Sequence, residues 1–244
     1  MKGAFMKKCI CAMVLTLALA AGGLSLASGL KMADGHILPL GNEMTIREAD
    51  KSYVGKELQK EWNQEKVEKE ILPAVKRMGL FGKGDTVHEK MMAEQLGKLF
   101  VAGRFSQLQM ETKDAFHQAA VVSVKLEEKD IAGWNEIIRA MEKVHPEKID
   151  ILGENQTLNL ETIRESMKKE DSNNRFVYKK DGQTEFIYGS MFLFVEQYGV
   201  EAPFYVFFIA SADKGQLGAT AIYTNQATGR IMEPVLVKGA EGLR

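Results

Sequence analysis

The region between residues 186 and 238 constrains the fold most, because it holds short apolar runs separated by turn signals. The runs are rich in aromatic and β-branched residues, which pack well on the pleated surface of a sheet. They cover residues 186–188, 191–195, 204–209 and 235–237. The spacing leaves no room for crossover helices, so the strands are predicted to pair in antiparallel fashion.

Turn residues fix where these strands reverse. Asp181-Gly182 is a strong two-residue hairpin signal, and Asp213-Lys214-Gly215 separates two further strands. The strands at 191–195 and 204–209 are apolar on both pleat faces and therefore need cover on both, or cover on one and a partner on the other. Residues 231–237 are predicted to form a last strand, at an edge of the sheet because Pro234 cannot donate to a ladder.

Helical patterns dominate the earlier part of the chain. Residues 45–48 resemble a capping box, and apolar side chains then recur at helical spacing as far as about residue 78. Further helices are predicted from Thr86, Asp130 and Asn159. Helices that come early and hairpin-linked strands that come late predict an α+β fold. We expect an antiparallel sheet of four to six strands, mostly from the C-terminal half, packed against N-terminal and central helices.

The first 27 residues have the pattern of an export signal. Three lysines precede an apolar core at residues 9–21, and small residues follow. Cleavage after Ala27 or after Ala20 fits the pattern. The prediction is an exported protein, with periplasm, cell envelope and medium all left open. A buried N-terminal helix is the competing interpretation.

The mature chain is predicted to contain no cysteine, because Cys9 and Cys11 both lie within the signal. This excludes disulfides, a thiolate nucleophile and cysteine-ligated metals from the mature protein. A core must then hold the fold together. Removing the three signal lysines from the 32 basic residues leaves 29, against 33 acidic residues. This mildly acidic balance does not favour nucleic acid as a partner.

The rest of the chain is predicted to divide into three parts. Residues 28–44 are expected to form a flexible leader, residues 45–78 an N-terminal helical arm, and residues 85–244 an α+β domain. The glycine-rich stretch at 79–84 is the candidate linker. A membrane hairpin at 186–210 is the competing interpretation of the apolar runs. No segment there reaches the roughly 20 apolar residues of a spanning helix, so no integral membrane span is expected after signal cleavage.

No motif predicts a catalytic, cofactor-binding or metal-binding site. The sequence from His88 to Met92 resembles a zinc-protease pentad, but methionine stands where the second histidine is needed. The other histidines, His36, His117 and His145, are scattered. No phosphate-binding loop, calcium loop or nucleophile elbow is present. The sequence therefore gives no reason to expect a cofactor.

Two functions remain in view. The first is a non-enzymatic binding or interaction protein, whose partner is a protein or a small apolar ligand held on an apolar patch. The alternative is an exported hydrolase with a site assembled in space. Its acids would be Glu185, Glu196 or Glu201, working with a distant histidine.

Overall fold

An eight-stranded antiparallel sheet forms the centre of the protein. The structure is a computed structural model, and it describes residues 24–25, 29–48, 65, 67–146, 152, 156–170, 176–197 and 200–244. The strand order is β1-β4-β5-β6-β10-β9-β8-β7. The strands are β1 (Leu24–Ser25), β4 (Thr45–Glu48), β5 (Arg104–Glu111), β6 (Phe116–Leu126), β7 (Phe176–Asp181), β8 (Thr184–Gln197), β9 (Val200–Asp213) and β10 (Gln216–Asn225). The predicted α+β class with an antiparallel sheet is confirmed, and the sheet has more strands than the expected four to six.

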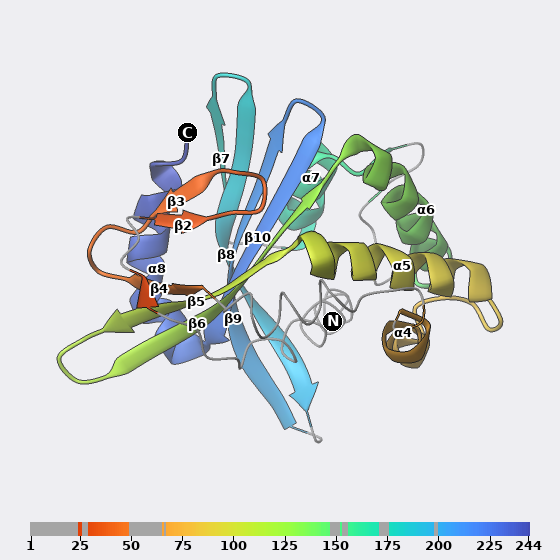
Figure 1. Cartoon of the computed structure of the whole chain (residues 1–244), viewed down its shortest axis with the longest axis horizontal. Helices are drawn as coiled ribbons and strands as arrows, with labels where there is room; N and C mark the ends of the chain where they lie inside the picture. The colour runs from red at the N-terminus through yellow and green to blue at the C-terminus, as the bar shows by residue number, and fades with distance from the viewer. Residues whose placement is uncertain are drawn as a thin grey trace.

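Helices and a small second sheet surround this central sheet. The helical segments are η2 (Val67–Ile71), α4 (Leu72–Met78), α5 (Thr86–Ala102), α6 (Glu128–Val144), α7 (Leu160–Glu170) and α8 (Gln226–Glu241). A hairpin of β2 (Gly29–Lys31) and β3 (Ile37–Pro39) forms the second sheet. Figure 1 shows α4, α5 and α6 grouped at one end of the molecule, with α8 and the β2–β3 hairpin at the other.

The predicted hairpin turns are confirmed. β7 and β8 join at the Asp181-Gly182 turn, where Gly182 has a φ of +60°. β9 and β10 join through Lys214 and Gly215, whose φ values of +46° and +79° are both positive. Two successive positive φ values suit a tight hairpin turn, because they match the twist of the flanking strands.

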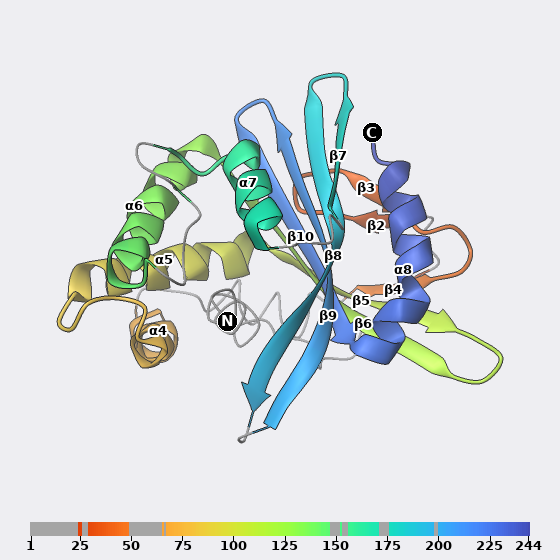
Figure 2. The ribbon, with the colours of Figure 1, turned by 180° about the vertical axis from the view of Figure 1, so that it is seen from behind.

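The central strands bury side chains on both faces. In β9, Tyr205, Phe207 and Ile209 lie in the main core, while Ala210 lies in a core on the opposite face. α8 and the β2–β3 hairpin cover the main core, and α7 covers part of the opposite face (Figure 2). The expectation that doubly apolar strands need cover on both faces is met in this part of the sheet. Burying each of the large apolar side chains contributes about 1.5–3 kcal/mol.

The predicted last strand at 231–237 is wrong, because these residues lie within α8. Asn225 caps the helix, its side chain accepting a 2.9 Å hydrogen bond from the Thr228 amide. The buried residues follow helical rather than alternating spacing: Thr228, Gly229, Met232, Val235, Leu236, Gly239 and Ala240. The short run at 235–237 looks like a strand only when it is read without this longer stripe.

The predicted flexible leader is wrong for residues 29–44. This segment supplies β2 and β3, and five of its side chains are at most 3 % exposed: Leu30, Met32, Leu38, Leu40 and Met44. They belong to the main core with α8 and the sheet. The segment is part of the packed fold.

The predicted helical arm at 45–78 is partly wrong. Its first four residues form β4, which pairs with β5. Residues 49–64 lie outside the described residues, and the helical prediction is confirmed from Val67 to Met78. Pro73 is the second residue of α4, where the π-helical turn η2 passes into the α-helix. Leu80 and Phe81, within the predicted linker, are buried with residues of α4, α5 and α6 in a separate helical core.

Replacing Gly239 with alanine tests the contact between α8 and the β2–β3 hairpin. A Cβ there would lie 2.2 Å from the backbone carbonyl oxygen of Pro39, which cannot move without displacing β3. Overpacking of this kind costs about 1–3 kcal/mol, more than the gain of up to about 1 kcal/mol in helix propensity. We expect Gly239→Ala to lower the free energy of unfolding, measured by urea denaturation.

Gly133→Ala in α6 is the matched control. Its added Cβ would meet only the end of the flexible Gln95 side chain, at 2.8 Å. Helix propensity should therefore dominate, and this variant should be neutral or slightly stabilised. Equal behaviour of the two variants would contradict the packing of α8 on the hairpin.

Candidate functional site

Of the three glutamates of the hydrolase hypothesis, only Glu185 has a described side chain, and its ion-pair partner is a lysine. Glu185 pairs with Lys180, whose Nζ lies 2.9 Å from its Oε1, and this hydrogen bond lowers the pKa of the Glu185 carboxyl. Glu196 and Glu201 are cross-strand partners in β8 and β9; their side chains lie outside the described part of the structure. The structure gives Glu185 the role of a surface ion pair.

The four histidines separate into two kinds. His117 is buried with its Nε2 3.2 Å from the Thr112 hydroxyl, and His145 ends α6 with its Nε2 2.9 Å from the carbonyl oxygen of Gly79. These contacts of His117 and His145 are typical of histidines with a structural role. His36 and His88 each lie beside an aspartate, and their environments decide what each pair can do.

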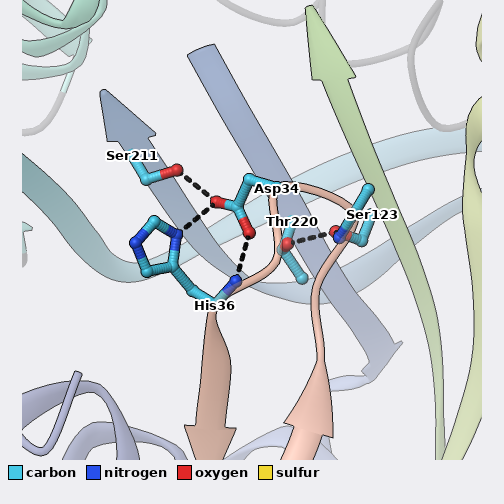
Figure 3. A network of polar contacts seen from close by, with 6 residues as sticks. Asp34, His36, Ser123, Ser211 and Thr220 are labelled. Atoms are coloured by element: carbon cyan, nitrogen blue, oxygen red, sulfur yellow. Dashed lines mark hydrogen bonds and ion pairs between the residues drawn. The ribbon is translucent and has the colours of Figure 1, made fainter. Parts of the chain in front are cut away.

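His36 belongs to a polar network where the β2–β3 turn meets the sheet (Figure 3). The Ser211 hydroxyl, on β9, donates to Asp34 Oδ2, and the His36 amide donates to Asp34 Oδ1 at 3.1 Å. The His36 Nδ1 is also 3.1 Å from Oδ2 but has no hydrogen bond of good geometry, so this contact is an ion pair only in the protonated form of the imidazole. The Asp34 side chain is only 7 % exposed.

Small residues on the sheet make room for this turn. A Cβ at Gly218 would lie 2.2 Å from Asp34 Oδ2, so only glycine leaves space for the carboxylate. The Ser123 hydroxyl, on β6, accepts the Ala33 amide at 2.7 Å and lies 2.7 Å from the Thr220 hydroxyl. These contacts bind the turn to β6, β9 and β10.

The order of contacts in this network differs from that of a catalytic triad. In a triad the serine hydroxyl bonds to the imidazole, which takes up its proton. Here the Ser211 hydroxyl donates to the Asp34 carboxylate instead. The arrangement satisfies a buried carboxylate, and we interpret it as the clamp that holds the β2–β3 hairpin on the sheet.

A groove of about 640 Å³ lies between α8 and the outer part of the sheet. Apolar surface makes up about half of its lining and comes from Val177 on β7, Tyr188 and Phe192 on β8, and Val237 on α8. Its volume lies within the range of small-molecule sites, which are mostly apolar with a few polar groups. We name this the α8 groove.

Three polar side chains give the α8 groove a polar end. The Ser190 hydroxyl, which is almost fully buried, donates to Glu233 Oε1. Arg230 lies one turn before Glu233 on α8 and is exposed, with no carboxylate partner in the part of the chain that the structure describes. Burial raises the pKa of the Tyr188 phenol, so the groove stays neutral at this position near pH 7.

The α8 groove was not predicted from the sequence, because residues 231–237 were assigned to a strand and in fact lie in α8. Arg230, Glu233 and Val237 lie three and four residues apart, which puts them on one side of a helix but not of a strand. The buried stripe from Thr228 to Ala240 was the signal that could have revealed this helix.

A second groove, of about 860 Å³, lies between the start of α5 and α6; we name it the α5–α6 groove. Asp85 caps α5, accepting the His88 amide, and its carboxylate oxygens lie 2.8 and 2.7 Å from His88 Nδ1. The predicted start of this helix at Thr86 is confirmed, and Asp85 is its N-cap. The hydrogen bond from the His88 side chain lowers the pKa of the Asp85 carboxyl.

The described residues form neither a metal-binding cluster nor a transmembrane helix. In the described ranges, no three side chains of histidine, cysteine, aspartate or glutamate converge to hold a metal ion. Among the described helices, none combines the length and apolar content of a transmembrane helix. No family model, curated protein or solved structure matches the chain. The α8 groove is our candidate site for an amphipathic ligand because apolar side chains and an exposed arginine line it together.

Proposed function

We propose that the protein is a non-enzymatic binding protein that holds a small amphipathic ligand in the α8 groove. The proposal rests on the mixed lining of the groove: apolar side chains from β7, β8 and α8 beside the exposed Arg230, which has no carboxylate partner among the described residues. The walls would bury the apolar body of the ligand, and the guanidinium would pair with an anionic group. Ser190 and Glu233 already satisfy each other and add hydrogen-bonding capacity beside it.

The proposed site of action is outside the cytoplasm. The pattern at residues 1–27 supports this; apart from residues 24–25, it lies outside the described part of the structure. β1 pairs with β4 through Leu24 and Ser25, so cleavage after Ala20 would keep this pairing and cleavage after Ala27 would remove it. We expect the intact mass of the protein recovered from outside the cytoplasm to match one of these two cleavages. The mass of the uncleaved chain would contradict export by a cleaved signal.

The hydrolase alternative has one feature in its favour, the Asp85–His88 pair beside a groove. Among the described hydrogen bonds, no serine or threonine hydroxyl reaches His88. A nucleophile in contact with its base is what such a site requires. The binding function is therefore the better supported of the two.

Dye binding tests the α8 groove directly. The probe is 8-anilinonaphthalene-1-sulfonate, which combines an apolar aromatic body with one anionic group. We expect one equivalent to bind the purified protein with a rise in fluorescence. Val177→Trp should fill the groove and abolish this binding, because Val177 is 46 % exposed and can be enlarged without disturbing the core. Arg230→Ala should weaken binding about two- to fivefold, as expected for an exposed ion pair.

Two control variants distinguish dye binding in the α8 groove from non-specific binding of the dye elsewhere on the surface. Val87→Trp adds the same side chain to an exposed position on α5, and Lys238→Ala removes a cation from α8 outside the groove. Both should bind the dye as the unmodified protein does. Absence of dye binding, or binding that Val177→Trp leaves unchanged, would refute the proposal.

A further inference from the structure

His88 has a fixed orientation in the α5–α6 groove. Both carboxylate oxygens of Asp85 face its Nδ1, and the ring stacks on Phe81, with centroids 6.1 Å apart and planes inclined by 19°. A carboxylate at Nδ1 favours the tautomer that carries its hydrogen there. The Nε2 lone pair is then available on the other side of the ring.

The available Nε2 faces a second electron-pair donor. Glu136 Oε1, on α6, lies 3.8 Å from His88 Nε2, and both residues line the groove. This separation is too long for a hydrogen bond. A neutral imidazole and a carboxylate placed in this way can share a cation, and a transition metal is the cation that suits imidazole nitrogen.

The dimensions fit a zinc-like ion. Zinc binds histidine nitrogen at about 2.0–2.1 Å and carboxylate oxygen at about 2.0–2.2 Å, which puts the two donor atoms of a tetrahedral site about 3.3 Å apart. The observed 3.8 Å must therefore close by about half an ångström. The Glu136 side chain is 59 % exposed and free to make this adjustment, whereas His88 is only 25 % exposed and already held.

We propose that His88 and Glu136 bind a divalent transition-metal ion of the zinc type, with Asp85 as the residue that positions His88. The Asp85–His88 contact is the carboxylate–histidine arrangement that commonly supports a metal ligand and raises its basicity. Water completes the coordination. The second ligand that the pentad at His88–Met92 lacks is supplied by α6.

Cations nearby limit the strength of this site but do not occupy it. Arg139 donates through Nη2 to the Gln156 carbonyl oxygen at 2.7 Å, and Lys143 interacts electrostatically with Asp85. With two protein ligands, the site binds more weakly than a three- or four-residue zinc site. The alternative occupant is a proton, since a protonated His88 would pair with both carboxylates.

Cobalt titration of the purified, untagged protein after signal cleavage, which lacks Cys9 and Cys11, distinguishes a metal from a proton. We expect one equivalent of Co²⁺ to produce visible absorption that Zn²⁺ abolishes and Mg²⁺ does not, because imidazole ligands favour transition metals. His88→Gln and Glu136→Gln should each weaken Co²⁺ binding at least tenfold. Asp85→Asn should weaken it roughly tenfold, as loss of a supporting carboxylate does.

His145→Gln is the matched control, because His145 ends the same helix that carries Glu136 but bonds to Gly79. It should bind Co²⁺ as the unmodified protein does. Circular dichroism checks that each variant is folded, and the exposure of Glu136 makes unfolding of Glu136→Gln unexpected. No stoichiometric Co²⁺ binding would overturn the proposal. So would binding that depends on His88 but not on Glu136, which would be single-histidine adsorption.

Discussion

The central strands carry large apolar side chains on both pleat faces, and this requirement shapes the rest of the fold. Tyr205, Phe207 and Ile209 point to one face of β9, and Phe208 and Ala210 point to the other. Leaving several such side chains in water would cost about 1.5–3 kcal/mol each, comparable in sum to a typical net stability of roughly 5–15 kcal/mol. α8 and the β2–β3 hairpin therefore cover one face, and α7 covers part of the other (Figures 1 and 2).

The α8 groove lies where this cover is incomplete. In the described part of the chain, β7 pairs with β8 from Phe176 opposite Gly189 to Asp181 opposite Thr184, while β8 continues beside β9 to Gln197. At this point the flank of α8 stands over the outer part of the sheet, with Ser190 and Phe192 below it. The same packing that builds the core thus leaves a bounded space with a polar end, which is the basis of the proposed binding function.

The sequence predicted the hairpin turns of the sheet better than it predicted the segments that pack over the faces of the sheet. Turn chemistry at Asp181-Gly182 and Lys214-Gly215 is local, so it could be recognised without knowing the fold. The docking of residues 29–44 depends on partners far along the chain, such as Ser211 and Gly218, and left only scattered apolar residues as a signal. The Asp–His pairs, three residues or fewer apart, were visible in sequence, but the groove beside His88 depends on α6.

The β2–β3 hairpin is a fixed part of the core, held through Asp34, and residue-by-residue amide hydrogen exchange is the most direct test of this packing. The Ala33 amide donates to Ser123 Oγ, and the Met32 amide donates to the His36 carbonyl oxygen at 2.9 Å. We expect both amides to exchange slowly, close to the rate of the core amides of β9. Exchange of Ala33 and Met32 at the rate of an unstructured peptide would contradict it.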